Sequence, residues 1–304
     1  RKDSGFAIFP YYTSDKIADM KDQIGPFSAI KVKKENSIYY WEPFATTPSF
    51  KIKRNLYKNS AGSHVLFEEI NTELNLTFKQ EWTSSSKYGL VRIAKISNND
   101  SNNQEIQILD GCRNIMPACA TVSLQNDSSV LLDAYKKTDL NLESRLAMFS
   151  LSSVLTDRAE PSEALWANTC WFSIDAPVYL NSAIEKQFAM DESITTSYPE
   201  ENLKGGGASC NIIKTFNLSP NQEESWYQVF DTKLELSRIN ELSKKLISNR
   251  NEVVQDLEKD IKDGQDLLNK YIQDADGQQN TNDDITCIHH KANVMFNIMR
   301  GGVF

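Results

Sequence analysis

Residues 74–82 have the sequence Leu-Asn-Leu-Thr-Phe-Lys-Gln-Glu-Trp, in which apolar and polar side chains largely alternate. A two-residue period of this kind is typical of a β-strand with one face buried. Residues 90–96, Leu-Val-Arg-Ile-Ala-Lys-Ile, and residues 105–110, Glu-Ile-Gln-Ile-Leu-Asp, show similar patterns. Between them, residues 97–103 are all Ser, Asn or Asp, which favours a turn. We therefore expect residues 90–96 and 105–110 to form a β-hairpin.

Strand-like runs recur through the first 230 residues on either side of this stretch. They include residues 39–41, 50–54, 65–70, 146–155 and 167–174. A helical or loop interruption is expected near residues 113–134. Closely spaced strands with few helices between them indicate large antiparallel sheets rather than a parallel α/β sheet. The triplet Gly205-Gly206-Gly207 predicts a loop, because it lacks the spacing of phosphate-binding glycine motifs.

The pattern changes at about residue 232, where apolar residues become spaced mostly three, four or seven apart. These residues are Leu234, Leu236, Ile239, Leu242, Leu246, Val253, Leu257, Ile261 and Leu268. Charged residues fill the gaps, so the segment predicts one long amphipathic helix or two helices. The polar residues 274–284 predict a linker. Residues 287–299 are expected to form another helix, which Arg300-Gly301-Gly302 would end.

Composition and charge narrow the class of protein. The chain has 304 residues, 40% of them hydrophobic, and a formal net charge of −8. This charge argues against a nucleic-acid partner or an anionic membrane, both of which attract clustered Lys and Arg. The chain has no apolar stretch of the roughly 20 residues that span a membrane. It starts Arg-Lys-Asp without the apolar core of a signal peptide, so none is expected here.

Cysteine and histidine are too few and too scattered for the common metal or nucleophile motifs. The five cysteines are Cys112, Cys119, Cys170, Cys210 and Cys287. Because none forms a Cys-x-x-Cys pair, we predict reduced and mostly buried thiols rather than a zinc site or a disulfide framework. The chain has three histidines, which gives little material for a metal site or a Ser-His-Asp triad. We predict no metal and no cofactor.

Several strings resemble those of a known group of proteins. They are residues 39–44, 54–59, 67–71, 87–92, 108–111, 114–117, 125–126, 133–137, 157–165 and 296–304. As a set, these strings resemble large proteins of the gut Bacteroidetes type that are similar to cellobiose-phosphorylase-like glycoside phosphorylases and hydrolases. The resemblance covers essentially the whole chain.

The resemblance implies an architecture and a division of labour. Residues 1–231 would form a mainly β domain, a β-supersandwich of the galactose-mutarotase-like type. Residues 232–278 would form a helical linker, and residues 279–304 would begin a truncated (α/α) barrel. The catalytic carboxylates would then lie beyond Phe304, where we expect the natural protein to continue. No residue of this chain is assigned a catalytic role.

Two candidate groups could contact a sugar. Trp41 beside Glu42, in an expected loop, pairs an aromatic ring with a carboxylate, although core packing is the competing interpretation of Trp41. Trp82, Trp166, Trp171 and Trp226 are further aromatic candidates. Arg300 follows the last expected helix and would either contact a sugar or phosphate or cap that helix.

Three carboxylates surround a proline in an expected turn: Asp157, Glu160 and Glu163. Glycoside chemistry needs two carboxylates about 5 to 10 Å apart. The competing interpretation is structural, with the acidic side chains capping a turn and a short helix. We favour that structural role.

Three functions follow as hypotheses. The first is a non-catalytic, carbohydrate-associated domain that packs on its own C-terminal catalytic domain in a glycoside hydrolase or phosphorylase. The second is an autonomous carbohydrate-binding module, and the third is a mutarotase- or epimerase-type enzyme, for which histidine is scarce. The expected partners are carbohydrate and the catalytic domain, with a homodimer left open. A location in the bacterial cytoplasm or periplasm would be compatible with each of the three functions.

Overall fold

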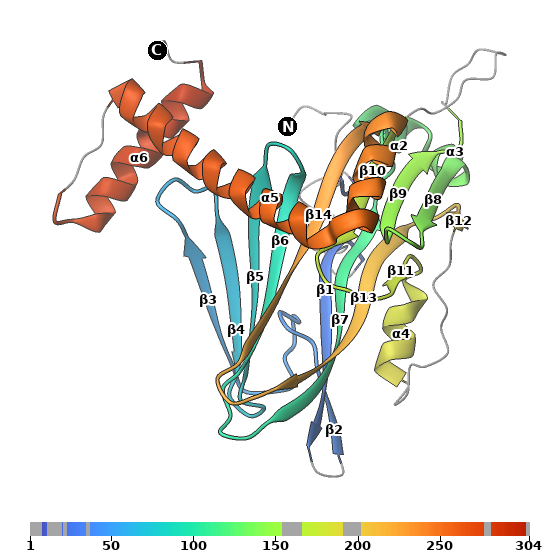
Figure 1. Ribbon diagram of the computed structural model, residues 1–304, viewed down its shortest axis with the longest axis horizontal. Helices are drawn as coiled ribbons and strands as arrows, with labels where there is room; N and C mark the ends of the chain where they lie inside the picture. Colours follow the sequence, from blue (N-terminus) through green and yellow to red (C-terminus); the bar gives the residue numbers. More distant parts are fainter. Residues whose placement is uncertain are drawn as a thin grey trace.

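The computed structural model describes residues 8–10, 20, 23–34, 37–153, 166–190, 202–276 and 281–301. The strands of this part of the chain form two antiparallel sheets, of nine and five strands, that face one another. The longest helices follow the last strand (Figure 1). The predicted mainly β fold with helices at the end of the chain is therefore confirmed.

The nine-stranded sheet has the order β12-β8-β9-β10-β14-β6-β5-β4-β3. Its strands are β3 (Ile52–Lys58), β4 (Val65–Asn71), β5 (Leu76–Ser85), β6 (Gly89–Asn98), β8 (Lys136–Asn141), β9 (Leu146–Leu151), β10 (Trp166–Phe172), β12 (Asn202–Lys204) and β14 (Glu223–Glu235). The alternating stretch 74–82 supplies most of β5, as its pattern predicted. Strand β14 lies at the centre of this sheet and leads directly into the longest helix.

The five-stranded sheet has the order β11-β13-β7-β1-β2. Its strands are β1 (Gly25–Lys34), β2 (Ser37–Trp41), β7 (Gln104–Ile115), β11 (Val178–Tyr179) and β13 (Ala208–Leu218). The main core lies between the two sheets and includes Ile30 and Ile108 from this sheet and Phe78, Phe149 and Trp226 from the other, each at most 1% exposed. Both sheets thus bury their facing sides against each other.

Five helices surround the sheets in the described part of the chain. They are α2 (Val122–Asp127), α3 (Ser129–Tyr135), α4 (Ala183–Met190), α5 (Leu236–Asp276) and α6 (Asp284–Met299). Helices α2 and α3 occupy the interruption expected near residues 113–134. Helix α4 packs Ile184 and Phe188 on the outer face of the five-stranded sheet. None of the described helices combines the length and the apolar character that a membrane crossing requires.

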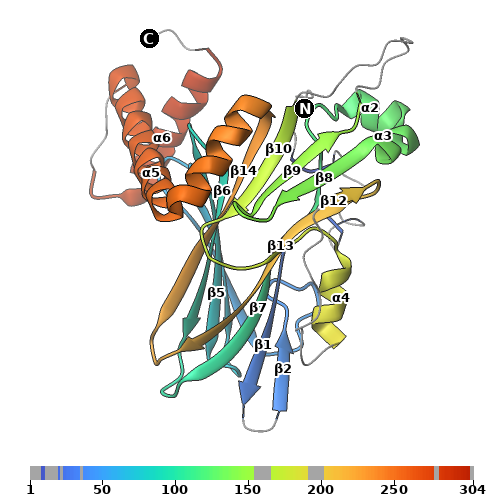
Figure 2. The same ribbon diagram turned by 45° about the vertical axis from the view of Figure 1, so that its right-hand side comes forward.

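Helix α5 crosses the outer face of the nine-stranded sheet, over β14, β6 and β5 (Figures 1 and 2). Its buried residues Ile239, Leu246, Val253, Leu257 and Ile261 form a second core with side chains of that face. These residues belong to the apolar set from which the helix was predicted. The middle of the nine-stranded sheet is therefore covered on both faces, which explains why β6 is apolar on both sides.

Two details of the prediction differ from the structure. The expected hairpin between residues 90–96 and 105–110 is wrong, because β6 pairs with β5 and β14 whereas β7 pairs with β1 and β13. The polar segment between them connects the two sheets. The helical region expected from residue 232 begins at Leu236, because β14 continues through Glu235. The segment forms α5, whose backbone departs from helical geometry at Asn249.

Candidate functional site

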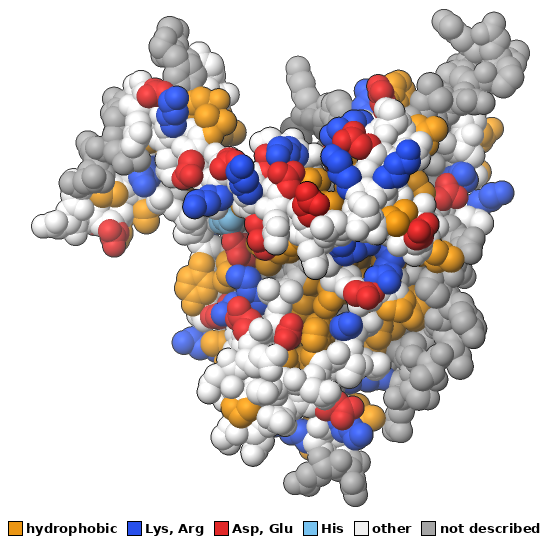
Figure 3. All heavy atoms as spheres, viewed as in Figure 1, with side chains coloured by type: hydrophobic (Ala, Val, Ile, Leu, Met, Phe, Trp, Pro, Cys, Tyr) orange, Lys and Arg blue, Asp and Glu red, His pale blue; other side chains and the backbone are white. Residues whose placement is uncertain are grey.

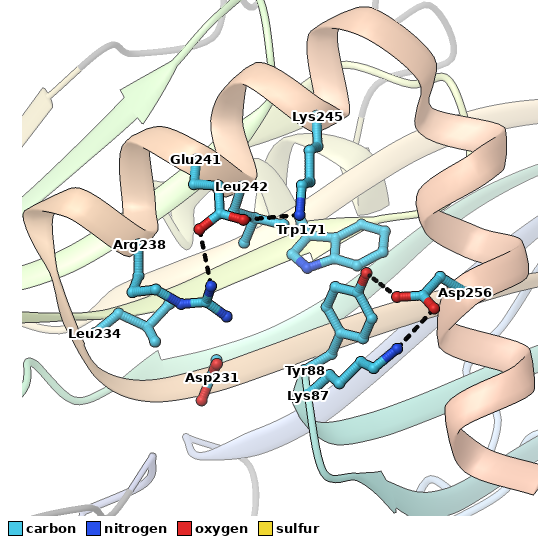
Figure 4. Close-up of a pocket in the computed structure, with 10 residues that line it drawn as sticks. All are labelled: Lys87, Tyr88, Trp171, Asp231, Leu234, Arg238, Glu241, Leu242, Lys245 and Asp256. Atoms are coloured by element: carbon cyan, nitrogen blue, oxygen red, sulfur yellow. Dashed lines mark hydrogen bonds and ion pairs between the residues drawn. The ribbon is translucent and has the colours of Figure 1, made fainter. Parts of the chain in front are cut away.

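A pocket of about 320 Å³ lies between α5 and the outer face of the nine-stranded sheet. We call it the helix pocket. Its lining residues are Lys87, Tyr88, Trp171, Asp231, Leu234, Arg238, Glu241, Leu242, Lys245 and Asp256 (Figure 4). They come from the β5–β6 turn, β10, β14 and both halves of α5. Three irregularities of the backbone border the pocket.

The first irregularity is a β-bulge in β14. Asp231 pairs with Thr169 of β10 and Leu234 pairs with Ala167, so three steps along β14 match two along β10. Lys233 in the bulge has a φ of 53°, in the left-handed region. Side chains three residues apart on a regular strand point to opposite faces. The extra residue brings Asp231 and Leu234 to the same face, where both line the helix pocket.

The second irregularity is the tight turn between β5 and β6. Gly89 has a φ of 87°, and a Cβ atom there would lie 2.3 Å from the carbonyl oxygen of Phe230 in β14. Only glycine fits this close approach without a shift of the backbone. The turn holds Lys87 and Tyr88 at the pocket. Asp260 of α5 accepts a hydrogen bond from the backbone N–H of Lys87 at 3.1 Å, which ties the turn to the helix.

The third irregularity is the kink in α5 at Asn249, where φ is −158° and ψ is 83°. The Asn249 side chain accepts a hydrogen bond from the backbone N–H of Glu252 at 3.2 Å, as an N-cap of the second half of the helix does. Arg250 donates to the carbonyl oxygens of Phe172 and Ser144, each at 2.5 Å. The kink is therefore anchored to the sheet, and it lets the helix bend around the pocket.

Asp256 organises the side of the pocket formed by the β5–β6 turn. Lys87 Nζ lies 2.8 Å from Asp256 Oδ1, and the Tyr88 hydroxyl donates to Asp256 Oδ2 at 2.9 Å (Figure 4). These two hydrogen bonds lower the pKa of Asp256 below its ordinary value. The Tyr88 ring meets the Trp171 ring edge to face, with 6.2 Å between centroids. Asp256 thus fixes the orientation of an aromatic wall.

Glu241 organises the opposite side, on the first half of α5. It accepts hydrogen bonds from Arg238 Nη1 and Lys245 Nζ, both at 2.8 Å. Figure 3 shows acidic and basic side chains intermingled along this helix. The two cations, Lys245 first, lower the pKa of Glu241. Such exposed pairs contribute little to stability, but they hold three polar side chains over the pocket.

Asp231 differs from the other two carboxylates of the pocket. Burial raises the pKa of Asp231, although the N–H of Thr232, which donates to Asp231 Oδ1 at 2.7 Å, and the charge of Arg238 act in the opposite direction. Figure 4 shows the Asp231 carboxylate below the Arg238 guanidinium. The pocket therefore combines one carboxyl group that resists ionisation with two that ionise readily. Environments that separate pKa values in this way are characteristic of functional sites.

The structure places the predicted residues Trp41 and Glu42 away from this pocket. Trp41 does not lie in a loop: it is the last residue of β2, is 2% exposed, and donates from Nε1 to Glu69 Oε1 at 2.9 Å. The strand-like run at residues 39–41 and the competing interpretation, core packing of Trp41, are therefore confirmed. Its ring packs in the core between the sheets, so it has no face for a sugar. Glu42 is half-buried, and its charge contributes to raising the pKa of Glu185 in α4, after the larger effect of burial.

Arg300 is exposed at the end of α6. Its backbone N–H bonds to the carbonyl oxygens of Phe296 and Asn297, and its guanidinium lies 5.2 Å from the centre of the Phe296 ring. Gly301 follows with a φ of 84°, which agrees with the helix end predicted there. The carboxylates Asp157, Glu160 and Glu163 lie outside the described residues.

The remaining tryptophans were also candidates for sugar stacking. Trp171 and Trp226 are each 1% exposed. Trp82 is half-buried and stacks on Phe230, with 6.4 Å between ring centroids. Trp166 is 37% exposed, but Lys233 Nζ lies 4.9 Å from the centre of its ring. Core packing, the competing interpretation, therefore holds for most of these rings.

A His–Glu pair that faces a cleft would support the epimerase-type alternative, and the structure contains a His–Glu pair. His64 Nδ1 lies 2.5 Å from Glu81 Oε1. The other ring nitrogen, Nε2, lies 3.0 Å from Thr83 Oγ1 and also contacts the side-chain amide of Gln265 in α5. Both ring nitrogens are thus occupied by side chains beneath the helix, and the pair does not line the helix pocket. Among the described residues, no group of three or more His, Cys, Asp or Glu side chains is placed to hold a metal ion.

The sequence did not reveal the residues of the helix pocket. Lys87 and Asp256 are 169 positions apart, and no motif connects them. One local signal exists: Asp231-Thr232-Lys233 interrupts the apolar alternation of β14 just before the helix. In the structure these residues form the bulge that turns Asp231 into the pocket.

Comparisons with known proteins bear on the fold. No protein-family model and no curated protein sequence matches this chain. A solved bacterial glucoamylase in complex with acarbose is similar over 80% of this chain and 31% of its own, with 10% identity and a TM-score of 0.44. A galactose mutarotase-like protein from Clostridium acetobutylicum is similar over 74% of this chain and 85% of its own, with 9% identity and a TM-score of 0.37.

A putative aldose 1-epimerase from Escherichia coli K12 is also similar, over 67% of this chain and 79% of its own, with 8% identity and a TM-score of 0.28. The chain thus spans about a third of the length of the glucoamylase, and most of the length of the two smaller proteins. A galactose mutarotase-like protein is thus among the solved structures to which the chain is similar. We take no argument about substrate or chemistry from similarities at this level.

Proposed function

We propose that this chain is a non-catalytic, β-rich domain of a carbohydrate-active protein, and that it packs on the helical catalytic domain of a glycoside hydrolase or phosphorylase. The sequence strings that resemble cellobiose-phosphorylase-like proteins support the class. The observation that carries the proposal is an uncovered apolar face on α6.

Helix α6 has two apolar faces. One contains Val294, which is 4% exposed, and lies towards α5. The other contains Ile285, Ile288, Phe296 and Met299, which are 66%, 44%, 57% and 80% exposed. Spacings of three, eight and three residues place these four side chains on one side of the helix. A single exposed apolar residue is ordinary, but a stripe of four marks a surface that another element covers.

The nature of this stripe favours a helical partner. Large side chains along one helix face interlock with those of another helix by packing ridges into grooves. The second half of α5 also exposes apolar side chains, Leu267 at 46% and Tyr271 at 43%. Full burial of each large apolar side chain contributes about 1.5–3 kcal/mol. The α5–α6 pair would then attach the β-domain to a helical domain.

The non-catalytic role is tested by direct assay. The 304-residue chain is incubated with aryl-glycosides and, separately, with disaccharides plus phosphate, and product is followed over hours. We expect no turnover above a heat-denatured control. Turnover that Asp231→Asn or Glu81→Gln abolishes would contradict the non-catalytic role and favour the epimerase- or hydrolase-type alternative.

The docking role is tested by the mass of the protein in solution. We expect the chain to remain monomeric in sedimentation experiments over a wide concentration range, and to bind a hydrophobic dye through the α6 stripe. Phe296→Glu combined with Met299→Glu should reduce that dye binding without lowering the melting temperature. Val130→Glu is the matched control, because Val130 is 84% exposed on α3, away from the stripe.

A dimer that the same double substitution dissolves would contradict the proposed partner, since a second copy of the chain would then cover the stripe. The autonomous carbohydrate-binding module is the alternative that keeps a specific observation in its favour. That observation is the helix pocket. Trp41 does not support the module, because its buried ring cannot stack on a sugar.

A further inference from the structure

We propose that the helix pocket binds one neutral sugar unit. The pocket itself supports the presence of a binding site and its polar character. The choice of a sugar rather than another small polyol rests on the proposed function. Four features support this inference: the size of the pocket, its balanced charge, the hydrogen-bonding groups that face it, and its apolar wall.

The size of the pocket suits a monosaccharide. Small-molecule sites commonly enclose about 300 to 1,000 Å³, and the helix pocket, at about 320 Å³, lies at the lower end. A single pyranose ring fits that range, whereas a longer oligosaccharide would extend into solvent. The walls come from the sheet, the β5–β6 turn and both halves of α5, so the site is enclosed by structural elements rather than by loops (Figure 4).

The charges of the pocket are balanced. Three basic residues and three acidic residues line it: Lys87, Arg238, Lys245, Asp231, Glu241 and Asp256. Ion pairs already join five of the six side chains to a partner within the pocket. A charged ligand would have to break such a pair or leave a charge uncompensated, which is costly in a half-enclosed site. Hydroxyl groups both donate and accept hydrogen bonds, so they match a lining in which donors and acceptors alternate.

Asp231 and Arg238 provide the principal contact for a hydroxyl group. The guanidinium uses Nη1 for Glu241, and it has five N–H groups in a planar fork. The Asp231 carboxylate accepts from the N–H of Thr232 through Oδ1. Figure 4 shows the guanidinium and the carboxylate next to each other with no hydrogen bond drawn between them. A hydroxyl between the two would accept from Arg238 and donate to Asp231.

The apolar wall is held in place before any ligand arrives. Tyr88 is fixed by its bond to Asp256 and by its edge-to-face contact with Trp171, while Leu234 and Leu242 complete the apolar lining. The C–H face of a pyranose packs well on such a surface. Side chains fixed in advance lose little entropy on binding, which favours affinity.

The backbone also indicates a functional pocket. The left-handed Lys233 in the bulge, the close approach at Gly89 and the non-helical Asn249 are three departures from regular geometry, and all three border this site. Bulges next to active sites redirect side chains, and Lys233 is held in the left-handed region within such a bulge.

The test titrates the 304-residue chain with methyl β-D-glucopyranoside, methyl β-D-galactopyranoside and methyl α-D-mannopyranoside, using calorimetry and saturation-transfer NMR. Sodium glucuronate and inorganic phosphate serve as charged probes. We expect saturable binding of at least one neutral glycoside and none of the charged probes. Asp231→Asn should weaken that binding about tenfold, the effect of a lost hydrogen bond to a charged group.

The matched control is Asp266→Asn, which removes the same charge from an exposed position of α5 outside the pocket. It should bind as the unaltered chain does. Leu242→Trp is a second variant that fills the pocket, and it should abolish binding even where Asp231→Asn fails to fold. The melting temperature of each variant is measured in parallel.

Absence of binding by all three glycosides, or equal affinity of the Asp231→Asn variant, would overturn the proposal. Preference for phosphate or glucuronate would overturn it as well. None of these results bears on the proposed docking through the α6 stripe, which dye binding and sedimentation test separately. Turnover of a bound glycoside would instead contradict the non-catalytic function and leave the sugar site standing.

Discussion

Arg92 and Asp110 form an ion pair that joins the two sheets across the core, with 2.6 Å between Arg92 Nη2 and Asp110 Oδ1. Both side chains are fully buried. Arg92 belongs to β6 and Asp110 to β7, the two strands that were expected to form a hairpin. Trp226 Nε1 and Ser28 Oγ also donate to the carboxylate, at 2.7 and 2.6 Å. The buried charge is thus satisfied only when the sheets are correctly placed.

Asp110→Asn should therefore lower the free energy of unfolding by about 3–5 kcal/mol, because it leaves the Arg92 charge buried without a counter-charge. Urea unfolding at constant pH measures the change. The double variant Arg92→Met with Asp110→Leu should lose much less than the sum of the two single changes, because it removes both charges. A loss of under about 1 kcal/mol for Asp110→Asn would contradict this account.

Gly89→Ala should destabilise the chain by at least about 2 kcal/mol more than Gly62→Ala does. Both glycines have a positive φ, of 87° and 72°, so both substitutions strain the backbone. A Cβ atom at Gly89 would meet the Phe230 carbonyl oxygen at 2.3 Å, whereas none of the neighbouring atoms lies within 4 Å of a Cβ at Gly62. Chemical unfolding of the two variants side by side isolates the clash. Equal losses would mean that the turn moves freely away from β14.

Cys287 should react with iodoacetamide faster than Cys112, Cys170 and Cys210. Hydrogen bonds from Thr281 lower the pKa of Cys287, which increases its thiolate fraction near neutral pH. Cys112, Cys170 and Cys210 are buried, and burial raises the pKa of the first two. Peptide mass spectrometry over a time course at constant pH measures each rate.

Cys287→Ser should remove the fast phase of this reaction and leave the three buried thiols unlabelled until urea unfolds the chain. Early labelling of a buried thiol would show that the two sheets separate readily.

Asp231→Asn should change how stability depends on pH. Burial raises the folded-state pKa of Asp231 above its ordinary value of 3.8, so the folded chain holds this proton more tightly than the unfolded chain does. Stability from this group is present below the unfolded pKa and falls as pH rises through the folded pKa. Asparagine does not ionise, so the variant should gain stability relative to the unaltered chain as pH rises above about 4.

Thermal unfolding from about pH 4 to pH 7 measures this difference. Asp266→Asn, which removes a carboxylate from an exposed position outside the pocket, is measured alongside as the control. A relative loss of stability by Asp231→Asn with rising pH would show that the Arg238 charge outweighs burial at this carboxyl group.

The elements that follow from local pattern were predictable. The alternation in residues 74–82 belongs to β5, and the spacing of Ile239, Leu246, Val253, Leu257 and Ile261 belongs to the buried face of α5. The period of apolar residues depends on the geometry of one element alone, so it can be read without a partner. Trp41 shows the limit of that approach, because its neighbours in sequence suggested a loop, whereas its burial depends on Glu69 and the opposite sheet.

The sequence by itself determined that the chain is mainly β with helices after the last strand, that its charge is acidic, and that its thiols are scattered. Only the tertiary structure decided which strands pair, that β6 and β7 belong to different sheets, and that Lys87, Asp231 and Asp256 meet in one pocket. The physical reason is the separation along the sequence over which each effect acts. Hydrophobic periodicity acts over a few residues, whereas strand pairing, the bulge at Lys233 and the ion pairs of the pocket depend on contacts between positions up to 169 residues apart.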